Sequence, residues 1–585
     1  MSKRLPLLPL LFAALPALAG GPINDNWSGR TAINPATLGS GFVDSQGSIG
    51  DATVEGTDPL LVCKNGDGTQ RGNTVWYQLD LSAASGPTYI NLSAAGYDSV
   101  VAVFTGNTGS GFTPVVGACN DDGGSSFAAS LAGARLDPGH DYSILVARPS
   151  PNPNPATLGF SAIASPQYTV TKTDDSADGS CSAVDCSLRE AISASNAVPG
   201  AVLIPAGQYT LTLSAASGEN ANATGDLDIV QGIGIYGAGA AATIVRGIQP
   251  GGNRERVFDV EPGNVSNRGI TANFADLTIA DASSVGPGGA INANGATSVA
   301  EHLALNGVVI RNNASTTNTG GGVHSSGPTV IANSTFSGNT SSSDGGGLAL
   351  NGSVITRSDV FNSTFANNSA NSDFVGGGGG IRSHTDLYVY NSTFSGNQAR
   401  HSGGGLLSTT SNGKLTLLNV TLFGNRADAN GNGGASGGGL RAEGLSAMVR
   451  NTAFGANLLG SGGGVAEDCA VSPAVAGSGN TSFLGNHLEV SSGQTTCPLA
   501  DASNVLGTPA LLGALADNGG STQTHLPGAT SPLIDSGYVA DCLSRDQRGI
   551  ARPQDGDGNA SAICDKGAVE VVWVLPDPIF LDGFE

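Results

Sequence analysis

The sequence predicts an all-β protein in which a β-sandwich or jelly-roll domain precedes a parallel β-helix. Three observations support this prediction: a seven-residue phrase that recurs about every thirty residues, glycine runs between its copies, and an N-terminal stretch with alternating strand patterns but no repeat. Repeats of this length, made of short strands and small polar turns, are typical of solenoids. The turn signals lie too close together for helices of ordinary length.

The recurring phrase begins and ends with asparagine and has an aromatic residue at its centre. Its first copy is Asn333-Ser-Thr-Phe-Ser-Gly-Asn339. The lead asparagines are residues 333, 362, 391, 419, 451 and 480, with separations of 29, 29, 28, 32 and 29 residues. Five copies keep both the aromatic residue and the closing asparagine: Phe336 and Asn339, Phe365 and Asn368, Phe394 and Asn397, Phe454 and Asn457, and Phe483 and Asn486. The copy at 419–425 has Leu422 in the aromatic position.

Stacking of the coils brings equivalent residues together, because neighbouring coils lie about 4.8 Å apart. We therefore expect the phenylalanines to form an inward column. The asparagines tolerate left-handed backbone angles, so we expect them to form a ladder at a corner. Glycine runs closed by one apolar residue supply a second turn, and they lie at 320–323, 345–348, 376–381, 403–406, 437–440 and 462–465. With looser coils from 208 to 279, the repeats at 208–503 predict about ten coils, a rod on the order of 50 Å long.

The alternation of Gly-Gly-apolar with Phe-x-x-Asn resembles the repeats of polymorphic outer-membrane proteins and related β-helix surface proteins. This resemblance implies a right-handed, pectin-lyase-like solenoid. It also implies a role in adhesion or surface display, which the spacing of the repeats does not itself indicate.

A separate domain is expected at 20–166, after a secretory signal at 1–19 that combines basic residues, an apolar run and a small-residue cleavage site. The segments Thr74-Val-Trp-Tyr-Gln-Leu79 and Ser99-Val-Val-Ala-Val-Phe104 alternate as strands do. Together with Asn24-Asp-Asn-Trp27 they resemble the bacterial pre-peptidase C-terminal jelly roll. The resemblance implies an accessory module of a kind that in some proteins binds carbohydrate or calcium.

A cap is expected at 167–207, before the first coil. The run Cys186-Ser-Leu-Arg-Glu-Ala-Ile192 resembles the CSLREA domain, which opens many bacterial β-helix surface proteins. A short amphipathic helix over 188–195 is expected to place Leu188 and Ile192 against the first coil, since the end of a solenoid exposes a strand edge. Arg189 and Glu190 are then expected to be solvated or capping residues rather than catalytic ones.

After residue 503 the repeat stops, and the region 504–570 resembles a choice-of-anchor Q C-terminal region. The resemblance rests on Asp546-Gln-Arg-Gly549 and Cys564-Asp-Lys-Gly-Ala-Val-Glu570. It implies that the region ends a β-helix ahead of a sorting tail. The tail at 571–585 resembles a bacterial sorting or secretion tag, and whether it anchors the protein, sorts it or is removed stays open.

Calcium is the one cofactor that the sequence suggests. Five aspartates are candidate ligands: Asp98, Asp121, Asp122, Asp555 and Asp557. A hard cation needs several converging oxygen atoms, but aspartate also caps tight turns, and both interpretations remain. An EF-hand at 555 is excluded, because Ala560 and Lys566 stand where such a loop needs glycine and glutamate.

The formal net charge of -22 argues against nucleic acid or an anionic membrane surface as a partner. Export makes disulfides plausible, and the eight cysteines fall into neighbouring pairs, with no spacing typical of a zinc site. Pairing of neighbours would join Cys63 with Cys119, Cys181 with Cys186, Cys469 with Cys497, and Cys542 with Cys564. The sequence leaves the connectivity open, and free thiols are the alternative. We expect a secreted or cell-surface protein without a transmembrane span, delivered by the export machinery.

Two hypotheses for function follow. The first is surface display, adhesion or glycan binding, with glycans or cell-surface molecules as partners. The second is a polysaccharide lyase or glycoside hydrolase, which needs carboxylates across the scissile bond or a carboxylate cluster with a basic residue. Counting from the glycine runs places Glu443, Asp468, Arg441 and His384 on one outward wall, and these are the candidate catalytic residues.

Overall fold

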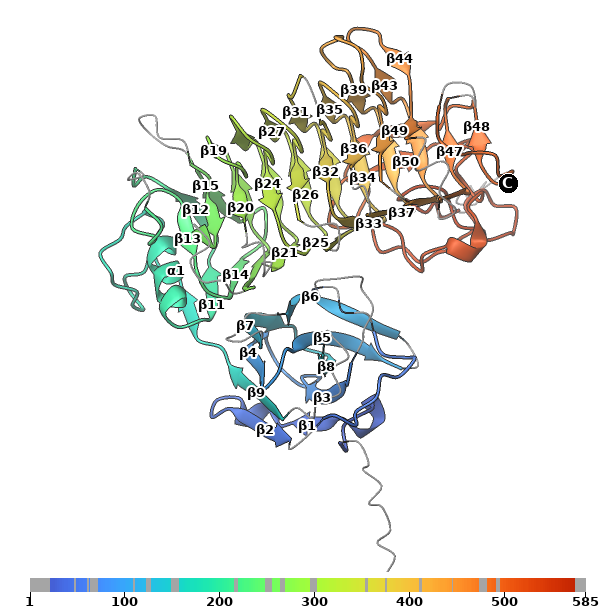
Figure 1. Ribbon diagram of the computed structural model, residues 1–585. Helices are drawn as coiled ribbons and strands as arrows, with labels where there is room; N and C mark the ends of the chain where they lie inside the picture. The colour runs from blue at the N-terminus through green and yellow to red at the C-terminus, as the bar shows by residue number, and fades with distance from the viewer. Residues whose placement is uncertain are drawn as a thin grey trace, which may run out of the picture.

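The computed structural model describes most of the 585-residue chain. The described residues are 22–46, 49–59, 61, 63, 72–108, 111–121, 128–148, 157–214, 219–247, 255–262, 269–294, 302–352, 356–373, 376–409, 413–444, 446–472, 481–490 and 495–573. The expected signal at 1–19, Asp122, Asn480 and most of the expected tail at 571–585 lie outside this part. Within it the protein is all-β, with an N-terminal sandwich and a parallel β-solenoid of about nine turns (Figure 1).

The sandwich consists of two sheets that face one another. One sheet has the order β1 (Thr31–Ile33), β3 (Val75–Asp80), β8 (Asp141–Ala147), β5 (Val100–Asn107) and β6 (Gly111–Asp121). The other has the order β2 (Phe42–Gln46), β9 (Leu158–Ala164), β4 (Thr88–Ala95) and β7 (Ala129–Leu136). Between them Tyr77 stacks on Phe160 with ring centroids 3.9 Å apart. The 3₁₀ turn η1 (Trp27–Gly29) precedes β1, and a second 3₁₀ turn, η2 (Pro35–Thr37), lies between β1 and β2.

The solenoid has four walls, each a sheet formed by one strand from successive coils. The docking sheet consists of β10 (Gln167–Thr169), β11 (Ala201–Ile204), β14 (Ile233–Gly237), β17 (Thr271–Ala275), β21 (His302–Asn306), β25 (Thr329–Ala332), β29 (Arg357–Phe361), β33 (Asp386–Tyr390), β37 (Lys414–Leu418), β41 (Ser446–Arg450) and β46 (Ser482–Leu484). The phenylalanine sheet consists of β12 (Gly207–Thr210), β15 (Thr243–Arg246), β18 (Thr278–Ala280), β22 (Val309–Arg311), β26 (Thr335–Ser337), β30 (Thr364–Ala366), β34 (Thr393–Ser395), β38 (Thr421–Phe423), β42 (Ala453–Gly455), β47 (His487–Leu488) and β48 (Val505–Leu506).

The other two walls follow the glycine runs. The glycine sheet consists of β13 (Leu227–Ile229), β16 (Phe258–Val260), β20 (Ile291–Ala293), β24 (Val323–Ser325), β28 (Leu348–Leu350), β32 (Ile381–Ser383), β36 (Leu406–Ser408), β40 (Leu440–Ala442) and β45 (Cys469–Val471). The short sheet consists of β19 (Ser283–Ser284), β23 (Ala314–Ser315), β27 (Thr340–Ser341), β31 (Ser369–Ala370), β35 (Gln398–Ala399), β39 (Arg426–Ala427), β43 (Leu458–Leu459) and β44 (Val465–Ala466). Pairing is parallel except between β43 and β44.

The predicted aromatic column is present in the middle of the solenoid. Phe336, Phe365 and Phe394 are fully buried and in register. Their ring centroids are 4.6 Å and 5.1 Å apart, with nearly parallel planes. Leu422 follows Phe394 in the register, as the phrase predicts, and Phe454 follows Leu422.

The predicted asparagine ladder is also present. The closing asparagines 339, 368, 397, 425 and 457 are buried, and each Nδ2 from Asn339 to Asn425 donates to the Oδ1 of the next at 2.9–3.0 Å. The lead asparagines from 333 to 451 have the expected left-handed backbone, with φ between 45° and 54°.

The last copy departs from the prediction. Phe483 pairs with Val449 in the docking sheet instead of following Phe454 in the phenylalanine sheet. Asn486 likewise leaves the ladder, and its Oδ1 accepts from the Thr452 backbone. The physical reason is that the chain turns back after residue 460 and β44 pairs antiparallel with β43. The last copy of the phrase therefore enters the next coil shifted relative to the earlier copies.

The N-terminal cap is the helix α1 (Leu188–Ala197). Ser187 and Glu190 form a capping box, so the capping role expected of Glu190 is confirmed. The expectation of solvated side chains is wrong, because Arg189 and Glu190 are both buried. Arg189 pairs with Asp175 at 2.7 Å and donates to the carbonyls of Gly225 and Asp226, and thereby ties the helix to the first coil.

The C-terminal region folds back along the solenoid instead of adding coils. Its elements are the hairpin β49 (Leu512–Ala516) and β50 (Thr524–Pro527) and the 3₁₀ turn η6 (Val539–Asp541). Four disulfides join the expected cysteine pairs: Cys63–Cys119, Cys181–Cys186, Cys469–Cys497 and Cys542–Cys564. Among the described residues, none of the helices has the length and hydropathy needed to cross a bilayer.

The sandwich packs against the early strands of the docking sheet through β6 and β7 (Figure 1). Asn120 donates to the Gly269 carbonyl at 2.8 Å, and Arg135 pairs with Asp276 at 2.8 Å. Gly133 has a φ of 66°, and a Cβ there would lie 2.4 Å from the Gly200 carbonyl oxygen. The backbones of the two domains therefore touch at a point where only glycine fits.

Candidate ligand-binding cleft

The docking sheet presents an outward face beyond the strands that the sandwich covers. On β29 and β33 the core side chains are Val360, Leu387 and Val389. Because side chains alternate along a strand, the intervening residues of these two strands point outward. They are Arg357, Asp359, Phe361, Asp386, Tyr388 and Tyr390. Three of them are aromatic, and apolar side chains gathered on one outward face are typical of an interaction site.

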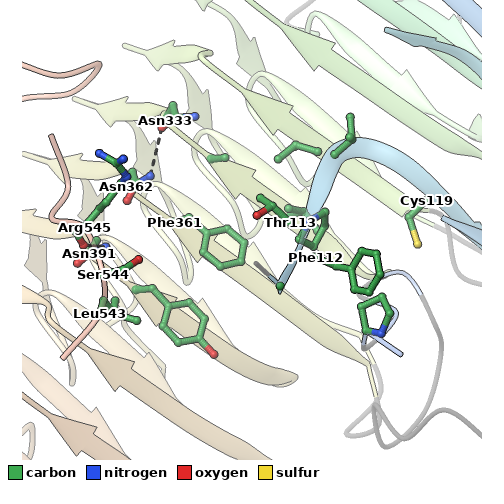
Figure 2. Close-up of a pocket in the computed structure, with 18 of the residues that line it drawn as sticks. Phe112, Thr113, Cys119, Asn333, Phe361, Asn362, Asn391, Leu543, Ser544 and Arg545 are labelled. Atoms are coloured by element: carbon green, nitrogen blue, oxygen red, sulfur yellow. Dashed lines mark hydrogen bonds between the residues drawn. The ribbon is translucent and has the colours of Figure 1, made fainter. Parts of the chain in front are cut away.

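A cleft of about 820 Å³ lies over the end of these strands. Its lining comes from three parts of the chain: the sandwich, through β6 and residues 57, 59 and 108; strands β21 to β33 of the solenoid; and the segment 543–549 of the C-terminal region. We call that last segment the strap. Figure 2 shows the ring of Phe361 between the strap, at Leu543 to Arg545, and the sandwich, at Phe112 and Thr113.

Phe361 and Tyr390 form a stacked pair that is only partly buried. Their ring centroids are 5.4 Å apart and the planes differ by 10°. Since Tyr390 lies in the following strand, the other face of Phe361 is turned toward the preceding strand, where its register partner is Ala332. A methyl group is too small to cover an aromatic ring. The cleft therefore offers one aromatic face above a small apolar floor formed by Ala332 and Val330.

Two of the charged residues on this face, Arg357 and Asp359, neutralise one another. Arg357 makes a bidentate ion pair with Asp359, at 2.8 Å and 2.7 Å, and its guanidinium lies 4.1 Å from the centroid of the Tyr388 ring. Burial raises the pKa of the Tyr390 hydroxyl to about 12, so it stays protonated as a donor. Burial lowers the pKa of His302, which also lines the cleft, to about 4, so its imidazole is neutral at pH 7.

A row of carboxamides borders the cleft where the strands end. Asn362 donates to Asn333 Oδ1 at 3.4 Å (Figure 2). The next lead asparagine, Asn391, turns instead to the strap and donates to the Arg545 carbonyl at 2.8 Å. Its Oδ1 has no hydrogen-bond partner within the described residues, although Asn391 is only 8% exposed. A buried acceptor of this kind favours a ligand that supplies a donor.

The strap is held on the solenoid by Gln547. Its Nε2 donates to Thr364 Oγ1 at 2.9 Å, and its Oε1 accepts from Thr393 Oγ1 at 2.7 Å. Both threonines lie in the phenylalanine sheet, so the strap crosses the corner between that sheet and the docking sheet. These bonds place Ser544 and Arg545 at the rim of the cleft as fixed parts of its wall.

Asp468 does not lie on an outward wall, so the predicted placement of this candidate catalytic residue on the same wall as Glu443 is wrong. The strand that continues the glycine sheet is β45, so Asp468 occupies the place of the last glycine in a run and points inward. Its Oδ1 accepts from Asn457 Nδ2 at 2.9 Å and its Oδ2 accepts from the Glu489 N–H at 2.8 Å. Burial raises its pKa to about 6. Asp468 is the last rung of the asparagine ladder.

The other three predicted catalytic residues lie at or near a second hollow of about 360 Å³, on the outside of the glycine sheet. Glu443 lines it together with Asp344, Arg382 and His401. Arg382 lies 3.5 Å from Asp344, and burial lowers its pKa while the carboxylates of Asp344 and Glu443 act against that shift. Two further predicted residues border this group: Arg441 pairs with Glu443 at 3.0 Å, and His384 hydrogen-bonds Thr409.

The predicted calcium ligands fall into two places. Asp121 is buried in the sandwich on β6, while Asp98 precedes β5. Asp555 and Asp557 meet a third carboxylate, Asp535, with one oxygen atom of each within 4.8 Å of the others. Backbone N–H groups already bind part of this cluster, since Asp535 Oδ2 accepts from Gly556 and Asp557 and Asp555 accepts from Gly558 and Ala560. This is the pattern of an aspartate turn, and calcium binding stays a prediction.

The sequence did not reveal the aromatic cleft, although one signal was available. The strand Asp386-Leu-Tyr-Val-Tyr390 alternates apolar core residues with aromatic ones, which marks an outward aromatic face once the inward residues are known. The strap and Phe112 carry no such signal, because their place in the cleft follows only from the fold.

No protein-family profile matches this chain, and no curated protein matches it. Solved structures with a similar arrangement include the catalytic domain of a GH87 alpha-1,3-glucanase variant in complex with tetrasaccharides, at 12% identity and a TM-score of 0.23 over 77% of this chain and 99% of that one. Another variant of that catalytic domain, in complex with nigerose, is 11% identical with a TM-score of 0.23 over 76% and 97%. Because the sequence identities and TM-scores are this low, the function of the present chain has to be inferred from its own residues.

Proposed function

We propose that this protein is an exported glycan-binding β-solenoid and that its ligand occupies the cleft between the sandwich, the docking sheet and the strap. The observation that carries the proposal is the half-buried ring of Phe361, which among the described residues stacks on one aromatic partner, Tyr390, in a cleft of about 820 Å³ bordered by a row of carboxamides. Concave sites with an apolar surface and a few placed polar groups are typical of ligand binding.

Sugar rings match both features of the cleft. A pyranose has a face of C–H groups, and the negative face of an aromatic ring attracts them. Its hydroxyl groups both donate and accept, as carboxamides do, so Asn333, Asn362 and the Oδ1 of Asn391, which no described residue pairs, provide suitable partners. The neutral Tyr390 hydroxyl adds a donor. The acidic net charge argues against nucleic acid as the occupant.

Substitution of Phe361 tests this proposal. Phe361→Ala removes an outward ring and leaves the solenoid core intact, so the fold is expected to persist by circular dichroism. Burial of a phenylalanine side chain contributes about 1.5–3 kcal/mol, so the affinity for a bound oligosaccharide should fall about 10- to 100-fold. Binding is measured on a glycan array and then by calorimetry with the best oligosaccharide.

Tyr538→Ala is the matched control, because Tyr538 is an aromatic residue that is 38% exposed and does not line the cleft. It should bind as the unchanged protein does. Equal affinities of the Phe361 variant, the Tyr538 variant and the unchanged protein would remove the cleft as the binding site.

An extracellular role in display or adhesion accompanies this proposal. Four disulfides suit an oxidising compartment, since such bonds are rare where thiols are kept reduced. The tail at 571–585 is proposed to direct sorting. Fractionation of cells that express the chain with and without residues 579–585 tests this: the truncated chain should leave the surface fraction, and an unchanged distribution would count against sorting by the tail.

The second candidate function is a carbohydrate-active lyase or hydrolase. The observation that favours it is the hollow on the glycine sheet, where Asp344 and Glu443 flank Arg382. Burial raises the pKa of Asp344, as a general acid requires. Release of reducing or unsaturated ends from a polysaccharide panel, abolished in Glu443→Gln and in Asp344→Asn, would establish this activity. Binding without any product would exclude it.

A further inference from the structure

The ionisable groups that line the cleft leave one positive charge uncompensated within the described residues. Arg357 is neutralised by Asp359, and His302 is neutral at pH 7. Asp546 pairs with Arg548 at 2.8 Å and accepts from the Glu570 N–H at 2.9 Å. The remaining lining charge is Arg545 on the strap.

The Arg545 side chain is exposed at the rim of the cleft, and no carboxylate among the described residues pairs with its charge. Its Nη1 donates to the Gly549 carbonyl at 2.7 Å. Its main chain is fixed twice, by the bond from Asn391 to its carbonyl at 2.8 Å and by the bridge to Ala551. Figure 2 shows Arg545 beside Asn362, on the side of Phe361 away from the sandwich. Its Nε and Nη2 are the donors left for a ligand.

We infer that the glycan bound in this cleft carries a carboxylate, and that Arg545 is the residue that recognises it. This inference rests on the proposed glycan-binding function. A guanidinium presents two parallel N–H groups that match a carboxylate, and such paired bonds are both directional and stronger than bonds between neutral groups. Asn391 Oδ1, to which none of the described residues donates, lies next to the Arg545 main chain and accepts from a hydroxyl of the same sugar.

The charges of the protein limit how many of the sugars in this ligand are acidic. A single arginine compensates one carboxylate, and a net charge of -22 repels a chain in which every residue is acidic. The Phe361 ring, in turn, packs best against the C–H face of an uncharged sugar. The ligand class that fits is an oligosaccharide in which a uronic acid alternates with neutral hexoses, with the acidic residue at Arg545 and a neutral one over Phe361.

A pair of probes tests the inference. The first is a tetrasaccharide of alternating glucuronic acid and glucose, and the second is the same tetrasaccharide after reduction of its carboxyl groups to alcohols. Calorimetry of the full chain should show that the acidic form binds about 10- to 100-fold more tightly, as a hydrogen-bonded ion pair contributes. Arg545→Gln should reduce binding of the acidic form to that of the neutral form, and Arg545→Lys should give an intermediate affinity.

Arg311→Gln is the matched control, because it removes one positive charge from the phenylalanine sheet outside the cleft. It should preserve the preference for the acidic form. Equal binding of both forms, lost in Phe361→Ala, would overturn the inference and leave the glycan-binding function standing. A preference that survives Arg545→Gln would overturn the role of Arg545, and failure of the unchanged protein to bind either form would overturn the inference together with the function on which it rests.

Discussion

Asn397 offers a direct test of the ladder, because its carboxamide is fully buried and makes four hydrogen bonds. Its Nδ2 donates to the Phe365 carbonyl at 2.8 Å and to Asn425 Oδ1 at 2.9 Å. Its Oδ1 accepts from the backbone and the side chain of Asn368 at 3.0 Å and 2.9 Å. Asn397→Ala leaves the buried Asn368 N–H without this acceptor, which costs about 1–3 kcal/mol, and removes three further bonds of about 0.5–1 kcal/mol each. We expect the free energy of unfolding to fall by about 4 kcal/mol.

Urea unfolding followed by far-ultraviolet circular dichroism measures this loss, and hydrogen exchange locates it. The Asn368 amide should exchange faster in Asn397→Ala, while amides several coils away keep their protection. Asn432→Ala is the control, because Asn432 is exposed in the loop between β39 and β40. A change of less than about 1 kcal/mol in Asn397→Ala, or no change in exchange at Asn368, would refute the reasoning that the ladder stabilises the coils.

Three further predictions concern stability. Burial lowers the pKa of Lys566 to about 8, so its charge is penalised in the folded state, and Lys566→Met should stabilise the protein by about 3 kcal/mol at pH 7. That gain should shrink between pH 8 and 10.5, and an equal gain at pH 7 and 10.5 would contradict it. Burial lowers the pKa of His302 to about 4, so stability linked to its neutral form should be lost as pH falls from 6.5 to 4. His302→Leu should remove that part of the pH dependence in unfolding measurements from pH 7 to 4, and identical profiles would refute it. The Cys63–Cys119 disulfide closes a loop of 56 residues, and its replacement by two serines should lower the unfolding free energy of the sandwich by about 4 kcal/mol. Tryptophan fluorescence of the sandwich reports this loss, and an unchanged denaturation midpoint would show that the loop is constrained in other ways.

The repeat could be predicted because its chemistry is local. In a parallel solenoid each residue pairs with its equivalent in the next coil, so a period in the sequence becomes a register in space. Phe336, Phe365 and Phe394 stack for this reason. Asparagine appears twice in each phrase because the lead position needs a left-handed backbone and the closing position needs a side chain that donates and accepts at once.

The same reasoning failed at the end of the solenoid. The run at 462–465 matches the glycine phrase, but Val465 is 62% exposed and pairs with β43 in an antiparallel manner. The glycine sheet resumes at β45, so residues counted from Val465 were placed on the wrong face, Asp468 among them. A short sequence motif indicates which turn is favoured locally. It does not indicate whether the chain completes the coil at that point, because completion of the coil depends on packing against the following segment.

The sequence by itself determined the coils, their inward column and their ladder, because each depends on spacing along the chain. The disulfide pairs follow the neighbouring cysteines that the sequence suggested, but only the structure settled their connectivity. Only the tertiary structure decided where the cleft lies. Its floor, its far wall and its strap come from segments as distant as Asn391 and Arg545, which are 154 residues apart and joined by one hydrogen bond. No period connects such residues. The cleft exists because the sandwich stops short on the docking sheet and the C-terminal region folds back along the solenoid, and both outcomes depend on packing between domains.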